Sequence, residues 1–133
     1  MSNKVNITTL LDGVKYTILH IYIKSDGASG DITKYKIVDP KDFNMGNAKK
    51  FCIESVSYAL SGFSADIVFD EGINGIESVV MSEGQPFYSD FCMYGGLRDW
   101  SGMDGDGCIY LNTYGIQHES DRGMIILKLR RSL

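Results

Sequence analysis

Hydrophobic and polar residues alternate along most of this chain, and side chains on a half-buried β-strand alternate in the same way. Segment 14–24, VKYTILHIYIK, shows the pattern most fully and is rich in β-branched and aromatic residues. Glycine, aspartate, asparagine or proline follows each such segment, as expected at turns. The pattern predicts about eight strands, at residues 14–24, 32–39, 50–60, 62–70, 75–81, 86–96, 107–115 and 123–131.

The alternation also predicts which side chains face the core. In the fourth segment the apolar residues that share one face are Phe63, Ala65, Ile67 and Phe69. In the last segment the predicted inward residues are Ile125, Leu127 and Leu129, and the predicted solvent-facing residues are Lys128 and Arg130.

The first connection, SDGASGD at residues 25–31, has the composition of a turn because Gly27 and Gly30 adopt positive φ easily. We therefore expect segments 14–24 and 32–39 to pair as a hairpin. Pro40 ends the second of these strands. The stretch that follows it is predicted to be a loop with a single helical turn.

Eight antiparallel strands without a long helical pattern favour two facing sheets. We predict an all-β fold, an antiparallel β-sandwich that is jelly-roll-like, as a single domain over residues 1–133. Residues 1–13 have three interpretations: an extended N-terminal arm that orders on a neighbouring molecule, a frayed terminus, or an additional edge strand. The apolar contacts of such an arm would be Val5, Ile7, Leu10 and Leu11.

The charge balance narrows the range of partners. The net charge is −4, and the basic residues gather near the C-terminus in KLRRSL, which argues against nucleic acid as the main partner. No apolar run approaches the ~20 residues that a membrane span needs, and the N-terminus lacks the apolar core of a signal peptide. We therefore expect synthesis in a cytoplasm, without membrane association.

The three cysteines, Cys52, Cys92 and Cys108, all lie inside apolar segments. An odd number of cysteines without short spacings is a poor disulfide framework and a poor zinc site. We expect them to be buried free thiols.

The sequence DGDG at residues 104–107 offers Asp104 and Asp106 as weak metal-ligand candidates. The distal glutamate of an EF-hand loop is missing, and a strand rather than a helix follows. Asp-Gly is a common signal for a tight turn, which is the interpretation we favour. A phosphate-binding loop would need a lysine and a following helix, and neither is present. We expect no bound metal and no cofactor.

Catalytic patterns are equally weak. His20 lies within a strand and His118 in a polar loop, and neither is flanked by other metal-ligating residue types. No Gly-x-Ser-x-Gly elbow is present to position a nucleophile. The acidic residues available for paired-carboxylate chemistry are Asp66, Asp70, Glu71 and Glu83, for which a solvated strand face is the favoured interpretation. We predict that the protein is not an enzyme.

Four stretches occur in an order that extends over nearly the whole chain: HIYIKSDGASGDITKYKIVDP at 20–40, ESVSYALSGFSADIVFD at 54–70, DFCMYGGLRDWSGMDGDGCIYLNT at 90–113 and SDRGMIILKLRR at 120–131. In this succession the chain resembles small virion structural proteins of tailed bacteriophages. The resemblance implies a capsid cement, or decoration, protein that bridges neighbouring capsid subunits from outside. It brings no catalytic residues with it.

The partners implied are the major capsid protein and further copies of this chain, as a homodimer or homotrimer, on the outer surface of the virion capsid. The contact candidates are Val5, Ile7, Leu10, Leu11 and Trp100. Two alternatives stay open: a tail or neck component of the same particle, and a carbohydrate-binding module. In the second alternative Trp100 and nearby tyrosines would stack on sugar rings.

Overall fold

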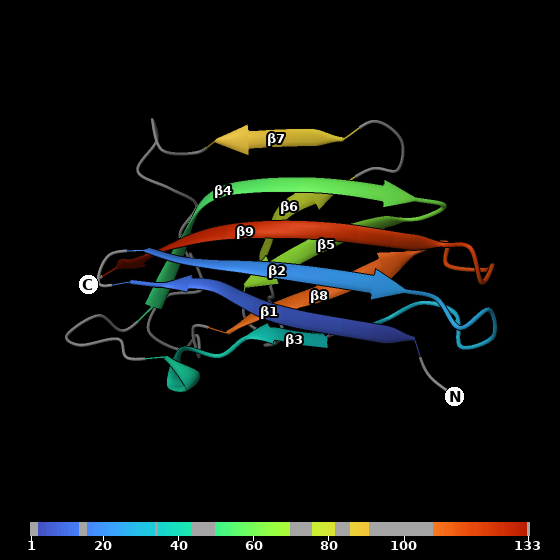
Figure 1. The fold of residues 1–133 in the computed structure, drawn as a ribbon, viewed down its shortest axis with the longest axis horizontal. Coiled ribbons are helices and arrows are strands. Elements are labelled where there is room, and N and C mark those ends of the chain that lie inside the picture. Colours follow the sequence, from blue (N-terminus) through green and yellow to red (C-terminus); the bar gives the residue numbers. More distant parts are fainter. Residues whose placement is uncertain are drawn as a thin grey trace.

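A computed structural model describes residues 3–13, 16–33, 35–43, 50–69, 76–81, 86–90 and 108–132. These residues form two antiparallel sheets and one short 3-10 helix (Figure 1). The elements are β1 (Lys4–Asp12), β2 (Tyr16–Lys24), β3 (Tyr35–Val38), η1 (Pro40–Asp42), β4 (Lys50–Ser61), β5 (Ser64–Phe69), β6 (Ile76–Met81), β7 (Phe87–Asp90), β8 (Ile109–Tyr114) and β9 (Arg122–Ser132).

The strand order confirms the predicted jelly-roll sandwich. One sheet has the order β1-β2-β9-β4-β7 and the other has the order β3-β8-β5-β6. From β2 onward the pairs are nested: β2 pairs with β9, β3 with β8, β4 with β7, and β5 with β6. A long antiparallel hairpin rolled into two sheets has this arrangement, which is that of the eight-stranded jelly roll.

Each of the eight predicted segments overlaps one strand, and the ninth described strand, β1, comes from the N-terminal segment. Of the three interpretations of that segment, the structure has the edge strand, since residues 4–12 pair along β2. The helical turn predicted after Val38 is η1, with Pro40 at its start and the Asp39 carboxylate accepting a hydrogen bond from Lys41 N. Within the described residues, no helix is long and apolar enough to cross a membrane.

The predicted hairpin between the first two strands is wrong. β2 pairs with β1 and β9, whereas β3 lies in the other sheet and pairs with β8. The connection instead binds the β8 strand: Ile32 N donates to Thr113 Oγ1 at 2.8 Å, and Thr113 N donates to Ile32 O at 2.9 Å. The glycine-rich composition of residues 25–31 predicted that the chain turns there, but it did not predict which strand β3 pairs with.

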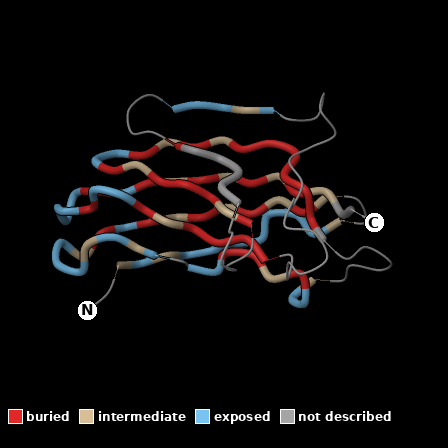
Figure 2. The backbone as a smooth tube through the Cα atoms, turned by 180° about the vertical axis from the view of Figure 1, so that it is seen from behind, coloured by how far each residue is buried: buried red, intermediate tan, exposed pale blue. Residues whose placement is uncertain are grey.

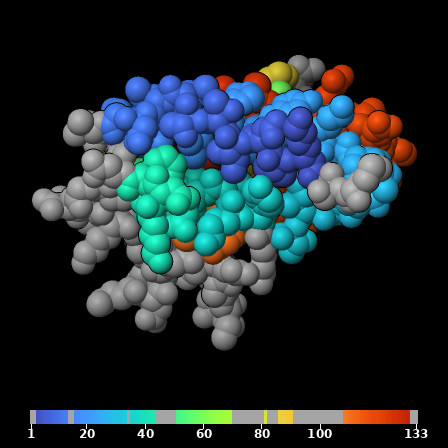
Figure 3. All heavy atoms as spheres, turned by 60° about the horizontal axis from the view of Figure 1, so that its bottom comes forward, coloured from blue at the N-terminus to red at the C-terminus, as the bar shows by residue number. Residues whose placement is uncertain are grey.

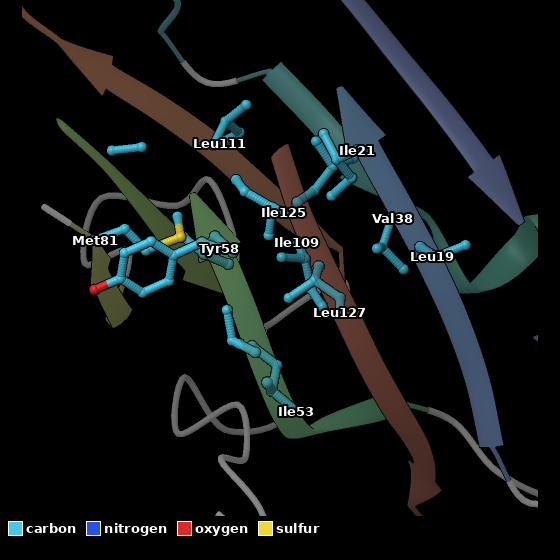
Figure 4. Packing of buried hydrophobic residues seen from close by; sticks show 14 of the residues in the cluster. Leu19, Ile21, Val38, Ile53, Tyr58, Met81, Ile109, Leu111, Ile125 and Leu127 are labelled. Atoms are coloured by element: carbon cyan, nitrogen blue, oxygen red, sulfur yellow. The ribbon is translucent and has the colours of Figure 1, made fainter. Parts of the chain in front are cut away.

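The core lies between the two sheets and is built by the predicted alternation (Figure 4). All seven residues predicted to point inward are buried: Phe63, Ala65, Ile67, Phe69, Ile125, Leu127 and Leu129. Truncating one large core side chain to alanine removes about 2–5 kcal/mol of stability.

Cys52 and Cys108 are buried free thiols as predicted, and Cys92 lies outside the described residues.

The end of the sandwich that holds the β8–β9 connection is organised by Asp121. Its carboxylate Oδ2 accepts hydrogen bonds from Gln117 N at 2.9 Å and His118 N at 3.0 Å, and its carbonyl accepts one from Ser25 N. The neighbouring β4–β5 turn passes so close that a Cβ on Gly62 would lie 2.0 Å from Asp121 Oδ1. Gly62 also has a φ of +90°, so both space and backbone require glycine there.

We expect Gly62→Ala to lower the free energy of unfolding by about 2–4 kcal/mol, because it combines left-handed backbone strain with displacement of the Asp121 carboxylate. Gly115→Ala is the matched control, since Gly115 has a φ of +91° but a Cβ added there would have no atom within 4 Å. The control should cost only about 1 kcal/mol from backbone strain. Urea unfolding of both variants measures the difference, and equal losses would show that the contact with Asp121 contributes nothing.

Candidate functional site

Most residues singled out for chemistry do not form a site in the described structure. Asp104, Asp106 and Trp100 lie outside the described residues, as do Asp70, Glu71 and Glu83. His20 is half-buried within β2, and His118 is exposed in the β8–β9 connection. In the described part of the chain, no group of three or more histidine, cysteine, aspartate or glutamate side chains is placed to hold a metal ion.

Asp66 corrects one expectation, because it does not lie on a solvated strand face. Its side chain is directed away from the core but is only 7% exposed. The carboxylate accepts hydrogen bonds from Asn112 Nδ2 at 2.9 Å and from Tyr114 Oη at 2.8 Å. Both donors come from β8, the strand paired with β5. A buried carboxylate needs such partners, and these bonds join β5 to β8.

Glu54 is a buried acid that the sequence interpretation missed. It is the extra residue of a β-bulge in β4, where the pairing with β9 shifts between Ile53 and Ser55. Its side chain is 4% exposed, and Oε2 lies 3.7 Å from Arg130 Nε. The interactions of Arg130 with Cys52, and then with Glu54, raise the pKa of its guanidinium. The sequence signal was a glutamate inside the apolar run FCIESV.

A row of three cations crosses the outer face of the five-stranded sheet. Lys24 lies directly opposite Lys4 on one side and Arg122 on the other. All three side chains are exposed, and the row lies at the end of the sandwich nearest the N-terminus (Figure 1). Like charges directly opposite each other on neighbouring strands destabilise a sheet. The row is therefore unfavourable for the isolated molecule and favourable beside an acidic surface.

We call Lys4, Lys24 and Arg122 the basic row. A hollow in the surface adjoins it. Its volume is about 440 Å³, and Lys24, Glu119, Ser120 and Arg122 line it. Among these described lining residues, Glu119 is the single acidic one. The ion pairs Lys36–Asp39 and Arg130–Glu54, both between described side chains, involve no member of the basic row. An anionic group on a partner would meet two cations in the hollow.

The second exposed feature is β1, an edge strand with apolar side chains. Of the predicted contact residues, Val5 packs against the core, whereas Ile7, Leu10 and Leu11 are 38%, 55% and 47% exposed. Ile7 lies opposite buried Ile21, on the core-facing side of the sheet, whereas Leu11 lies opposite Ile18, on the outer face. Figure 2 shows β1 and β7, the two outer strands, mostly pale blue or tan, while the strands between them hold most buried residues.

A groove of about 340 Å³ runs between β1 and the edge of the facing sheet. In Figure 3, β1 in dark blue lies beside β3 and η1 in teal and green on this face. The groove is lined by Ile7, Thr9, Leu19, Lys36, Ile37, Val38, Asp39, Asp42 and Phe43. Apolar side chains of β1, β2 and β3 line most of it, and its charged residues are Lys36 of β3 and Asp39 and Asp42 at η1, so it extends the exposed surface of β1.

Comparison with known proteins gives no family. No protein-family model matches the sequence, and no curated protein matches it. Among solved structures, a candidate mannose-6-phosphate isomerase from Ralstonia eutropha JMP134 aligns with a TM-score of 0.35 and 11% identity, over 98% of this chain and 86% of that chain.

An RmlC-like cupin family protein with a double-stranded β-helix fold, from Methanocaldococcus jannaschii, aligns with a TM-score of 0.34 and 8% identity. That alignment covers 95% of this chain and 81% of the other. TM-scores this low say nothing about the activity of this chain. Its fold is established by its own strand order.

The loop carboxylates make stability depend on pH. Hydrogen bonds from Ser29 and Ala28 lower the pKa of Asp26 from its ordinary 3.8 to about 2. Hydrogen bonds from Gln117 and His118 N–H groups likewise lower the pKa of Asp121. A lowered folded-state pKa contributes stability that is complete above the unfolded-state pKa and is lost as pH falls through the folded-state value.

We therefore expect the thermal unfolding midpoint to fall between about pH 4 and pH 2, the window set by the two Asp26 values. Asp26→Asn should make this fall smaller, because the amide does not titrate, while Asp121 still contributes. Calorimetry from pH 7 to pH 2 provides the measurement. An Asp26→Asn variant that loses as much stability over this window as the wild type would contradict the assignment.

Proposed function

We propose that this protein is a non-enzymatic capsid cement protein of a tailed bacteriophage, and that it bridges major capsid subunits on the outer surface of the head. The observation that carries the proposal is the basic row of Lys4, Lys24 and Arg122 beside its hollow. The sequence resemblance to phage virion proteins supports the part of the proposal that places this protein in a virus particle.

A bridging protein needs a rigid scaffold, and two buried carboxylates of this sandwich form hydrogen bonds that hold its strands and connections together. Asp66 joins β5 to β8, and Asp121 fixes the β8–β9 connection. Both carboxylates are therefore engaged in hydrogen bonds within the chain. A rigid scaffold loses little conformational freedom when it binds, which favours attachment through modest contact areas.

The basic row supplies the attachment in this proposal. A carboxylate-rich surface on a capsid subunit would relieve the repulsion among the three cations and add attraction of its own. Since all three side chains are exposed, this attraction would be screened by salt over about 8–10 Å. When many copies bridge two subunits each, weak individual contacts add to a lasting attachment and resist the outward pressure of packaged DNA.

The test is binding of the purified protein to empty capsid shells of the same phage. We expect Lys24→Glu with Arg122→Glu to weaken binding at least about tenfold, because reversed charges repel an acidic surface. Wild-type binding should also weaken as salt rises. Lys41→Glu is the charge-matched control for Lys24→Glu alone, which should also weaken binding, since Lys41 is exposed on η1 at the opposite end of the sandwich.

Equal loss of binding in the control would show that net charge, not the basic row, governs attachment. Wild-type protein that does not bind the shells at low salt would contradict the proposal itself.

Copy number separates the head from the tail or neck. A cement protein should approach the abundance of the major capsid protein in purified virions, because it follows the capsid lattice. Quantitative mass spectrometry of virions measures the ratio. A ratio at the level of the tail proteins would place the chain in the tail or neck instead.

A further inference from the structure

We propose that the capsid contacts the outer face of the five-stranded sheet, and that an apolar patch on this face forms the core of the contact. The inference rests on the proposed function and deepens it, because it names the contacting face and the chemistry of the partner surface. That surface belongs to a capsid subunit and is apolar at its centre and acidic where it meets the basic row.

The outer face consists of the residues that alternate with those of the core. On β2 and β9 the core-facing residues, such as Ile21 and Ile125, are buried, so their neighbours along each strand point away from the core. Four of these neighbours are large, apolar and half-buried, and Leu11 of β1, opposite Ile18, is 47% exposed. We call these five residues the outer patch: Leu11, Ile18, Tyr22, Met124 and Ile126.

Charged side chains border the outer patch. At one end, Lys24 and Arg122 of the basic row are each two residues from the opposed pair Tyr22 and Met124. At the other end, Lys128 lies opposite Ile18. Protein–protein interfaces have this anatomy, with an uncharged core enriched in aromatic residues and methionine and a polar rim around it.

The charge of this face favours an acidic partner over a second copy of the chain. Its described cations outnumber its described acids by five to two, although the whole chain has a net charge of −4. Two such faces placed against each other would repel, whereas an acidic surface would be attracted. The cations are Lys4, Lys24, Arg122, Lys128 and Arg130, and the acids are Glu54 and Asp90.

A single-stranded nucleic acid is also anionic, but it binds by stacking its bases on open aromatic rings. On this face, Lys128 Nζ lies 4.4 Å from the centroid of the Tyr16 ring, so a cation already occupies one side of that ring. A protein surface needs no open ring, because apolar side chains pack against the outer patch from any direction.

The size of the face suits attachment through many weak contacts. From Arg122 to Arg130 the strand extends about 27 Å, and the five strands together span about 19 Å. The footprint is therefore about 500 Å² on each partner, below the roughly 800 Å² of a standard stable interface. One copy would bind weakly, and bridging several subunits would make the attachment lasting.

Binding to empty capsid shells in about 1 M salt tests the inference, because the charged contacts are then screened within about 3 Å. We expect the wild type to retain measurable binding from the outer patch. Met124→Gln with Ile126→Thr should weaken it at least about tenfold, since polar groups would be buried without partners. Val68→Thr is the matched control, because Val68 is half-buried on the outer face of the other sheet. Circular dichroism melting shows whether each variant is folded.

Footprinting of the wild type with hydroxyl radicals tests the same face without any variant. On bound shells Met124 should lose most of its oxidation. Tyr114, 52% exposed on the other sheet, should keep the oxidation of the unbound protein. If the double variant does not fold, this measurement decides, and an unprotected Met124 would overturn the inference.

The outcomes separate this inference from the proposed function. Wild-type protein that binds no shells at low salt overturns both. Binding that is lost in about 1 M salt, or that the double variant retains in full, overturns this inference alone. So does a wild-type dimer that the double variant dissociates, or a single-stranded oligonucleotide that binds the wild type more tightly than the shells do.

Discussion

The structure depends on a single constraint: the inner faces of two sheets must present their apolar side chains to one shared core. β9 lies at the centre of the larger sheet, and its buried residues Ile125, Leu127 and Leu129 stand opposite buried residues of β2 and β4. A slip of one residue in either pairing would turn these side chains to solvent. The nested order of strands allows the other strand pairs also to turn their apolar side chains toward the shared core.

The same constraint explains where the molecule is left exposed. β1 is an outer strand of the larger sheet, away from the centre of the shared core, and its residues Ile7, Leu10 and Leu11 remain accessible. The basic row ends on this strand, because Lys4 begins β1 and lies opposite Lys24. Two exposed features, the basic row and an edge strand with apolar side chains, are therefore adjacent on the same sheet.

Much of the fold could be predicted because alternation is a local property. The apolar faces of β5 and β9 follow from residues two apart, and the structure confirms them. Strand partners are not local: the glycines at residues 25–31 predict a turn equally well whether β3 returns to β2 or crosses to the other sheet. The bulge at Glu54 and the burial of Asp66 also depend on neighbouring strands, so their environments were not evident from the sequence.

The central claim is that this sandwich acts by attachment to a capsid. Cryo-electron microscopy of the intact particle tests it most directly. The account predicts density for the sandwich at regular positions on the outside of the head, with Lys24 and Arg122 directed toward the capsid subunits. Shells without that density, or density for this chain confined to the tail, would contradict it.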